Sequence, residues 1–176
     1  RGVPGTHDTN LAINTIDALK IPGEVAVPRF DKAVDDRDPQ TQWPVVQAPL
    51  DVIVLEGWCL GIDAQPEESL AQAVNELEAN EDPDSIWRRY VNTAMRDRYQ
   101  TFNNLVDHLV MLNAPDFEKV YQWRQNQEDK LAEKFQQEGA ADSHRIMSPE
   151  ELKRFIQHYE RVTRHGLDTL TDKADV

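Results

Sequence analysis

The sequence predicts an α/β fold built on a parallel β-sheet, and two apolar runs with helical sequence between them carry this prediction. Residues 50–57 are mostly branched aliphatic residues without polar alternation, which is typical of a strand buried on both faces of a parallel sheet. Residues 108–113 form a second run of this kind. The sequence between the two runs is long and has helical periodicity, as the crossover between parallel strands requires.

After a loop that contains two glycines and a proline, the first predicted helix has apolar positions from Leu11 to Leu19 and ends before Pro22. Its apolar side chains recur at helical spacing, and Asp8 or Thr9 supplies the N-cap. A short strand is predicted at residues 25–28, and a polar loop dense in Asp and Arg follows at residues 31–42. Polar loops of this kind often contact ligands.

Four further helices are predicted from apolar positions that recur every three or four residues. They are expected over residues 66–79, 84–104, 115–137 and 148–165. The last has the clearest boundaries, because Ser148 and Glu151 match a capping box and Pro149 suits the first helical position. Gly166 stands where a glycine commonly ends a helix.

The composition excludes several classes of function. The 176 residues include 32 acidic and 19 basic side chains, which gives a net charge of −13. This charge repels nucleic-acid phosphates and anionic lipid headgroups, so no nucleic-acid or membrane partner is expected. Cys59 is the single cysteine, which excludes an internal disulfide and favours a reducing, cytoplasmic location. The apolar run at residues 52–55 is too short to cross a bilayer.

Glu56 follows the first predicted strand, at the end where parallel sheets bind ligands. A carboxylate there can hold Mg²⁺ through water, and Gly57 lets a phosphate approach the backbone closely. The alternative is that Glu56 is simply the first exposed residue after the strand. The pattern alone leaves both interpretations open.

Arg124 and Glu128 fall on the apolar face of the predicted helix 115–137, in line with Phe117 and Phe135. Burying both charges is costly unless they pair or meet a ligand. One explanation is a structural ion pair between residues four apart on a helix. The other is an arginine that binds the transferred phosphate, with Glu128 fixing its orientation.

The five histidines match no familiar metal-site spacing, and scattered surface positions are the simpler interpretation. His7 differs because it lies in the loop with glycines and proline, beside Asp8. Two interpretations remain open: the His7 imidazole contacts a substrate, or it forms a hydrogen bond within the local turn. Cys59 has no basic neighbour in the sequence, so we expect an inert buried thiol rather than a nucleophile.

Four segments taken together resemble a known family. They are residues 1–8 (RGVPGTHD), 28–32 (PRFDK), 52–58 (VIVLEGW) and 121–128 (YQWRQNQE). In this order they resemble the P-loop small-molecule kinases of the D-glycerate 3-kinase type, which are related to pantothenate kinase, uridine kinase and phosphoribulokinase. Residues 147–163 are also similar to the helix that follows the lid in this family, so the resemblance spans most of the chain.

The resemblance implies a three-layer P-loop NTPase-like fold, in which helices flank a parallel sheet. It also implies transfer of the γ-phosphate of ATP, with Mg²⁺, to a hydroxyl of a small hydroxy acid such as D-glycerate. The chain is then one partial kinase domain, with acceptor-binding loops at residues 1–49, a Walker B-like strand at 50–57 and a helical and lid region at 66–166.

Expected site residues follow from the same resemblance. The acceptor would be bound by Arg1, Thr6, His7, Asp8, Arg29, Asp31 and Lys32. Glu56 would be the Walker B type acid that holds Mg²⁺ through water, while Gly57 and Arg124 would contact the nucleotide phosphates. Glu56 and Arg124 are therefore the expected catalytic residues. A mobile lid would include residues 137–147.

The sequence departs from the family pattern because it contains no GxxxxGK[ST] motif to hold the phosphates. That motif, the first strand and the upstream catalytic acid would all precede Arg1. The fold is therefore expected to be incomplete, and this chain alone is expected to be inactive and to self-associate through uncovered sheet. The alternative is a non-catalytic regulatory or scaffold protein that retains a kinase-like fold.

Overall fold

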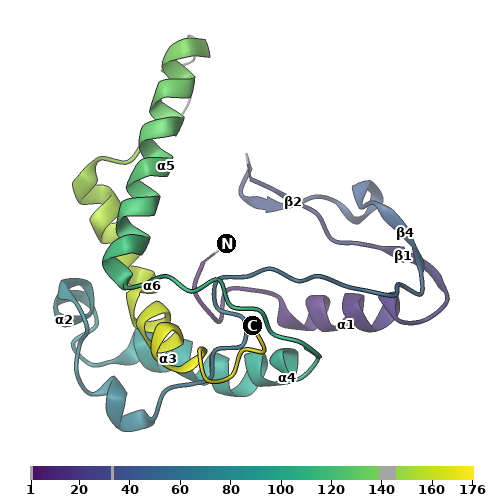
Figure 1. Cartoon of the computed structure of the whole chain (residues 1–176), viewed down its shortest axis with the longest axis horizontal. Coiled ribbons are helices and arrows are strands. Elements are labelled where there is room, and N and C mark those ends of the chain that lie inside the picture. The colour runs from purple at the N-terminus through teal and green to yellow at the C-terminus, as the bar shows by residue number, and fades with distance from the viewer. Residues whose placement is uncertain (1, 33, 139–145) are drawn as a thin grey trace.

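The computed structural model describes residues 2–32, 34–138 and 146–176. Figure 1 shows two parts of different character. One is a group of helices around the C-terminal end of the chain, from which the long helix α5 (Phe117–Glu138) extends. The other is an arm in which one helix lies beside extended chain.

The arm begins with α1 (Thr9–Leu19), which confirms the helix expected at these residues. The Asp8 carboxylate accepts a hydrogen bond from the Leu11 backbone N–H at 3.0 Å, so Asp8 is the N-cap. β1 (Gly23–Ala26) follows and pairs antiparallel with β4 (Val45–Ala48). The strand predicted near this position is therefore present, beginning slightly earlier in the chain.

A small hairpin lies between these two strands in the sequence. β2 (Phe30–Asp31) pairs antiparallel with β3 (Asp36–Arg37), and the short 3₁₀ helix η1 (Gln40–Gln42) leads on to the second strand of the arm. The hairpin falls within the polar loop that the sequence predicted at residues 31–42. It brings some of the Asp and Arg side chains of that loop into a defined arrangement.

The centre of the helical part is an almost unbroken run that confirms the helix predicted at residues 84–104. It consists of α3 (Ile86–Ala94), the π-helical turn η3 (Met95–Tyr99) and α4 (Gln100–Asn103). A π turn inserts extra backbone into a helix and changes the direction of the side chains that follow it. The sequence pattern gave no sign of this turn.

The prediction of one continuous helix over residues 66–79 is wrong. The structure instead has the 3₁₀ helix η2 (Glu67–Leu70) and the short helix α2 (Glu76–Glu81), with irregular chain between them. The Arg161 guanidinium donates to the Gln72 carbonyl at 2.5 Å, which satisfies a backbone group that a continuous helix would have paired internally. A distant arginine therefore replaces local helical hydrogen bonds here.

α6 (Pro149–Thr169) packs against α5 in the helical part. The capping box predicted at its start is confirmed, because the Ser148 hydroxyl accepts from the Glu151 N–H and the Glu151 carboxylate accepts from the Ser148 N–H. The helix end predicted at Gly166 is wrong, since the helix continues through it. None of the described helices is long and apolar enough to cross a membrane.

Gly166 is a glycine for a packing reason rather than for a turn. It is buried, and a Cβ atom built on it would lie 2.5 Å from Cδ1 of Ile62. The absence of a side chain therefore lets the loop that carries Ile62 approach α6 closely. A glycine at this place in the sequence has the same appearance as a C-terminal cap, which explains the wrong prediction.

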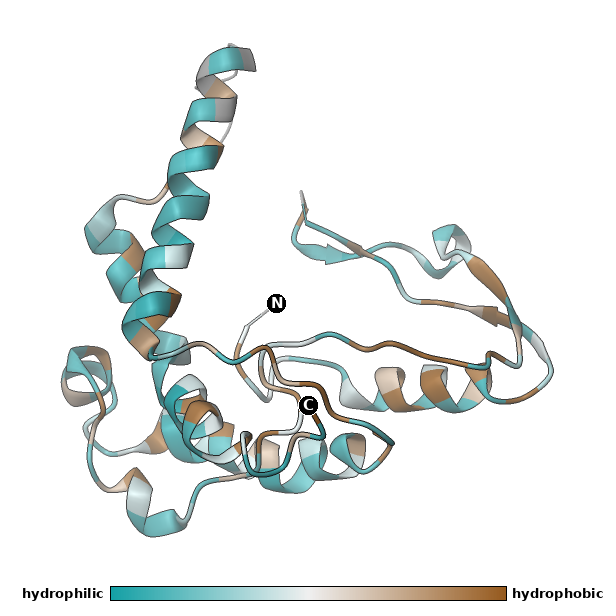
Figure 2. Ribbon diagram, viewed as in Figure 1, coloured by the Kyte–Doolittle hydropathy of each residue, from teal (hydrophilic) through white to brown (hydrophobic). Residues whose placement is uncertain are grey.

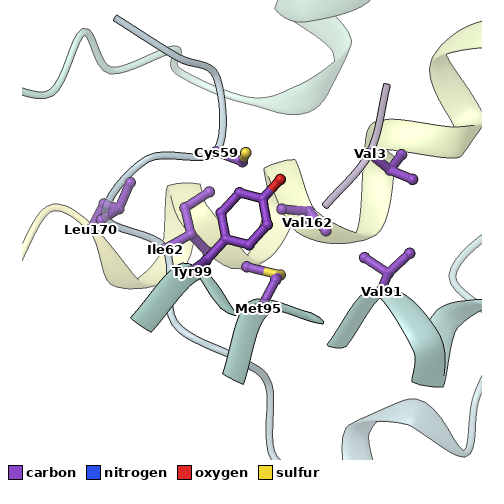
Figure 3. Packing of buried hydrophobic residues seen from close by; sticks show 8 residues of the cluster. All are labelled: Val3, Cys59, Ile62, Val91, Met95, Tyr99, Val162 and Leu170. Carbon is purple, nitrogen blue, oxygen red and sulfur yellow. The ribbon is translucent and has the colours of Figure 1, made fainter. Parts of the chain in front are cut away.

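The main core joins the N-terminal loop, the loop after residue 58, the α3–η3 run and α6 (Figure 3). Its buried residues are Val3, Cys59, Ile62, Val91, Met95, Tyr99, Val162 and Leu170. A smaller cluster of Phe117, Leu152 and Ile156 attaches α5 to α6. Cys59 is buried in the main core, where desolvation raises the pKa of its thiol to about 12, as expected for an inert thiol.

The parallel sheet is not formed by the residues that the structure describes. Residues 50–57 and 108–113 are extended, and the described sheets are the two antiparallel pairs. The second segment is joined to the C-terminal residues without forming a sheet: the Asp175 N–H donates to the Leu109 carbonyl and the Met111 N–H to the Val176 carbonyl. Val54 is 88% exposed and Leu112 is 94% exposed, and Figure 2 shows both segments as apolar chain. A strand buried on two faces needs neighbouring strands and covering helices, and these are not supplied by the described residues.

Candidate functional site

The N-terminal loop, residues 2–8, is folded into a tight turn that fixes most of its polar side chains. The Thr6 N–H and hydroxyl both donate to the Val3 carbonyl, at 3.2 and 2.7 Å. Gly5 adopts a φ of +100°, which L-residues rarely adopt. We call residues 2–8 the acceptor loop, after the role that the family resemblance implies. Arg1, which was expected in the same site, lies outside the described residues.

His7 is held from the core side of the acceptor loop. Its Nδ1 atom is hydrogen-bonded to the hydroxyl of Tyr99, a core residue that is only 2% exposed. Burial lowers the pKa of His7 from its ordinary value, so the imidazole is neutral at pH 7. The local-turn interpretation of His7 is therefore incomplete, because its partner is a residue far away in the sequence.

Asp8 connects the acceptor loop to the hairpin. Its carboxylate caps α1 and also accepts from Arg37 at 2.9 Å. The hydrogen bond from the Leu11 backbone lowers the pKa of Asp8, and Arg37 lowers it further. The predicted acceptor segments at residues 2–8 and 29–32 are therefore brought together through a residue of the hairpin, Arg37, that the prediction did not include.

The other acceptor candidates lie on or beside the hairpin. Arg29 is largely exposed and its Nε atom lies 3.3 Å from the Asp38 carboxylate. Asp31 is half-buried in β2, where it pairs with Asp36 across the hairpin. Lys32 is exposed. The three expected residues thus share one small structural unit.

Glu56 is exposed at the end of the unpaired segment 50–57, and its carboxylate has no hydrogen bond or ion pair with the described residues. Gly57 allows a close turn, because a Cβ built on it would lie 2.9 Å from Cγ of Leu60. Within the described ranges, no three Asp, Glu, His or Cys side chains gather as a metal site. A single carboxylate is nevertheless compatible with Mg²⁺, which commonly keeps several waters and takes its other oxygens from phosphates.

Arg124 and Glu128 form the i,i+4 ion pair that one interpretation expected, with Nη2 and Oε1 2.7 Å apart. Glu128 is 3% exposed, while the Arg124 side chain is 35% exposed. Glu128 also accepts from the Met147 N–H at 3.3 Å. The buried Glu128 carboxylate is therefore bonded by two groups. It orients the Arg124 guanidinium, which is partly open to solvent.

The Arg124 guanidinium retains unused hydrogen-bonding capacity. Its Nη1 donates to Gln127 at 2.7 Å, but its buried Nε has no hydrogen-bond partner among the residues described. Its carbon atom Cζ lies 5.8 Å from the ring centre of Phe155 on α6. The unpaired Nε is closed to solvent, so an additional anion would reach only the exposed part of the guanidinium.

A row of aromatic rings leads from Arg124 to the segment that follows Glu56. Phe155 and Tyr159 on α6 have ring centres 5.1 Å apart, and Tyr159 meets Trp58 edge-on at 5.2 Å. Trp58 in turn donates from its indole N–H to the Gly2 carbonyl at 3.3 Å. The acceptor loop, the turn after Glu56 and the helix that carries Arg124 are therefore connected by packing.

Two parts of the expected site are not joined directly. No contact links Glu56 to Arg124 in the described part of the chain, and Figure 1 shows the hairpin strand β2 and α5 well apart. Most of the predicted lid, residues 139–145, lies outside the described residues. The structure thus assembles the acceptor side more completely than the phosphate side.

Three residues that hold the acceptor loop were not predicted from the sequence: Arg37 bonds Asp8, Tyr90 bonds the Gly5 carbonyl, and Tyr99 bonds His7. Arg37 had a signal, since it stands in the Asp- and Arg-rich loop already noted as a ligand-binding candidate. Tyr90 and Tyr99 had none, because an aromatic residue at helical spacing looks like an ordinary core residue.

A hollow of about 470 Å³ lies at the start of α3. It is lined by Glu81, Asp82, Pro83, Asp84, Ile86, Trp87 and Tyr90. Three carboxylates make this lining a poor match for a phosphate or an organic acid, because like charges repel. The hollow is therefore not the candidate site, although Tyr90 borders both.

The chain is similar in sequence to known kinases, although no family model matches it. It is 31% identical over 178 residues to a chloroplastic D-glycerate 3-kinase from Arabidopsis thaliana, a match that covers 97% of the chain and 35% of the relative. It is also 31% identical over 185 residues to a Schizosaccharomyces pombe protein named uncharacterized kinase mug58, covering 99% of the chain and 61% of that protein.

The fold of the chain is also similar to that of a solved structure. A D-glycerate 3-kinase structure from Cryptococcus neoformans matches with a TM-score of 0.69 and 23% identity, over 95% of the chain and 60% of that structure. The chain therefore spans only part of the length of the proteins it matches, between 35% and 61% of the two curated relatives. Along nearly its whole length the chain is similar in sequence to a D-glycerate 3-kinase and to a second kinase, and its fold is similar to that of a D-glycerate 3-kinase structure.

Proposed function

We propose that the protein containing this chain transfers the γ-phosphate of ATP to a hydroxyl group of a small hydroxy acid, with D-glycerate as the favoured acceptor. The observation that carries the proposal is the 31% identity to a D-glycerate 3-kinase over 97% of the chain. A match of that extent includes Glu56 and Arg124. It does not by itself assign the acceptor, which is why the site chemistry is also considered.

Residues 29–38 hold the three basic side chains that would bind an anionic acceptor, Arg29, Lys32 and Arg37, beside four aspartates. The chain as a whole carries a net charge of −13, so an organic acid is attracted only where basic side chains are concentrated. Arg37 forms an exposed ion pair with Asp8, whereas the exposed Arg29 pairs with Asp38, whose side chain is 17% exposed. An exposed ion pair stabilises a protein by only about 0–1 kcal/mol, so a substrate carboxylate can replace Asp8 as the partner of Arg37 at little cost.

The phosphate side would depend on Glu56 and Arg124. Phosphoryl transfer requires positive charge on the oxygens of the moving phosphate, and Arg124 offers a guanidinium whose orientation is fixed by buried Glu128. Glu56 would hold Mg²⁺ through water, and the ion would neutralise charge between the phosphates. Gly57 would contact the phosphates through its backbone, on the side that the Leu60 side chain does not fill.

The chain would work as one partial kinase domain. Its acceptor-binding loops are residues 1–49, its Walker B-like segment is 50–57, and its helical and lid region is 66–166. The sequence has no GxxxxGK[ST] motif, so residues 1–176 by themselves should bind ATP weakly and release no ADP. We propose that the complete active site includes residues beyond this chain.

The test is ADP release by the whole protein, with Mg·ATP and a panel of D-glycerate, pantothenate, uridine and ribulose 5-phosphate. Release stimulated by D-glycerate alone is the expected result. Residues 1–176 are the matched control, and turnover by this control would contradict the expected inactivity. Stimulation by another acceptor would still support a kinase, but its acceptor would not be D-glycerate.

The regulatory or scaffold alternative makes a different prediction for the same experiment. A protein that had lost its nucleotide site would fail to bind ATP in isothermal titration calorimetry and would release no ADP with any acceptor. Failure to bind ATP, by a protein that melts cooperatively, would therefore overturn the kinase proposal in favour of that alternative.

A further inference from the structure

One helix holds the acceptor loop through two tyrosine hydroxyls. Tyr90 on α3 donates to the Gly5 carbonyl at 3.2 Å. Tyr99 in the π turn η3 is hydrogen-bonded to Nδ1 of His7. The Gly5 carbonyl and the ring of His7 are thus fixed by residues that the proposed chemistry does not otherwise use.

The fit between the loop and the helix is close. A Cβ built on Gly5 would lie 2.7 Å from Cε1 of Tyr90, so only glycine allows the loop this near to the helix. Figure 3 shows the Tyr99 ring inside the core with its hydroxyl pointing toward Cys59 and Val3, where the acceptor loop crosses. Tyr99 is 2% exposed, so its hydroxyl must find its partners within the protein.

The π turn explains how both tyrosines reach the same loop. Residues nine positions apart on an uninterrupted α-helix lie about 180° apart around the axis, at about 100° per residue. A π turn adds about one residue, which brings Tyr99 to within about 80° of the Tyr90 direction. Without η3 (Met95–Tyr99), Tyr90 and Tyr99 would point to opposite faces.

The hydrogen bonds determine which nitrogen of His7 carries the proton. Burial raises the pKa of Tyr99 well above its usual value, so the hydroxyl keeps its hydrogen. Because Tyr99 is buried, its hydroxyl hydrogen needs an acceptor within the protein, and the partner that the described residues give it is Nδ1 of His7. A neutral imidazole that accepts at Nδ1 must carry its proton at Nε2, the nitrogen that Tyr99 leaves available.

We propose that Tyr99 is a positioning residue for the acceptor: its hydroxyl donates to Nδ1 of His7, and so presents the Nε2–H of His7 as a fixed hydrogen-bond donor in the acceptor loop. A donor of defined position suits a carboxylate or hydroxyl oxygen of a small hydroxy acid. The role in catalysis rests on the proposed function, whereas the link from Tyr99 to the His7 proton does not.

The experiment compares Tyr99→Phe with Tyr90→Phe in the whole protein. Tyr99→Phe removes the hydroxyl bonded to His7, while Tyr90→Phe removes only the bond to the Gly5 carbonyl. The ring-nitrogen shifts of His7, measured by long-range ¹H–¹⁵N NMR at pH 8, report the tautomer of the neutral ring. Steady-state kinetics then give KM for D-glycerate, KM for ATP and kcat.

The expected result is a single Nε2–H tautomer of His7 in the wild-type protein and in Tyr90→Phe, and a mixture of tautomers in Tyr99→Phe. We expect Tyr99→Phe to raise KM for D-glycerate by on the order of tenfold, as for the loss of one hydrogen bond, with KM for ATP unchanged. A merely structural tyrosine would alter both KM values or neither.

Two results would overturn the proposal. An unchanged Nε2–H tautomer in Tyr99→Phe would remove the link between Tyr99 and His7. A mixed tautomer with unchanged KM for D-glycerate, in an active enzyme, would remove the positioning role. If the wild-type protein does not phosphorylate D-glycerate, the proposed function fails, and the NMR comparison still decides whether Tyr99 sets the His7 proton.

Discussion

The helical part and the extended segments of this chain contain equally apolar sequence but differ completely in burial. In the helical part, Leu70 and Leu152 are fully buried and Tyr99 is 2% exposed. In the extended segments, Val54 is 88% exposed and Leu112 is 94% exposed. The difference shows that the helices complete their own packing, whereas neither apolar segment lies in a sheet of the described residues. Residues 108–113 are held by two backbone hydrogen bonds to residues 175–176, and residues 51–56 have no such bond in the described structure.

Buried ion pairs show the same difference between the helical part and the extended segments. In the helical part, Arg161 forms a two-pronged pair with buried Glu78 and also donates to backbone carbonyls, and Arg88 bonds Asp82 while 4% exposed. These pairs tie the irregular chain around η2 and α2 to α3 and α6. No comparable network holds residues 50–57 in the described structure.

The largest expected effect is on the helical part. Arg161→Ala leaves Glu78 buried without its partner, so we expect the free energy of unfolding to fall by about 3–5 kcal/mol. Urea denaturation followed by circular dichroism measures this change. Arg154→Ala is the matched control, because the Arg154–Glu81 pair is exposed and should matter by about 0–1 kcal/mol. Equal losses from the two variants would contradict the role given to burial.

Arg124→Ala tests whether α5 serves the chemistry or only the helical part. We expect kcat of the whole protein to fall on the order of a hundredfold with little change in melting temperature, because a charge that binds the moving phosphate acts in the transition state. Arg124→Lys keeps the charge and should retain part of the activity. A large loss of stability with kcat unchanged would instead make Arg124–Glu128 a structural ion pair.

Gly166→Ala tests the close contact between α6 and the loop at Ile62. Helix propensity favours alanine by about 1 kcal/mol, but overpacking a core costs about 1–3 kcal/mol, so we expect a net loss of about 1 kcal/mol. Ile62→Val removes the Cδ1 atom that the new methyl group would meet. Gly166→Ala in that background should therefore cost less than in the wild type, and equal costs would show that the contact is not the cause.

The smallest expected effect on stability is in the extended segments. Val54→Asp should change the free energy of unfolding of residues 1–176 by less than about 0.5 kcal/mol, because the side chain is 88% exposed. The same change should reduce self-association of this chain, measured by sedimentation velocity, since it places a charge on an apolar edge. A monomeric wild-type chain would show that the segment does not drive association.

Features that depend on neighbouring residues were predictable from the sequence. The capping box of Ser148 and Glu151, the Asp8 cap and the helices at residues 9–19, 84–104 and 115–137 follow from local hydrogen bonds and apolar spacing. The Arg124–Glu128 pair was predictable for the same reason, since four residues make one helical turn.

Features that depend on distant partners were not predictable. Residues 50–57 have the composition of a central strand, but a strand forms only where other strands pair with it. The break after η2 depends on Arg161, which is far along the chain. Tyr99 reaches His7 only because a π turn redirects it, and sequence periodicity assumes a regular helix.

Trp58 gives the candidate site an optical signal of its own. Its indole N–H is bonded to the Gly2 carbonyl, and its ring meets Tyr159 edge-on, so it lies at the boundary between the acceptor loop and α6. Indole fluorescence responds to the loss of a hydrogen bond and to a change in polarity around the ring. Any ligand that shifts the acceptor loop should therefore change the emission of Trp58, which can be separated from the other tryptophans by comparison with Trp58→Phe.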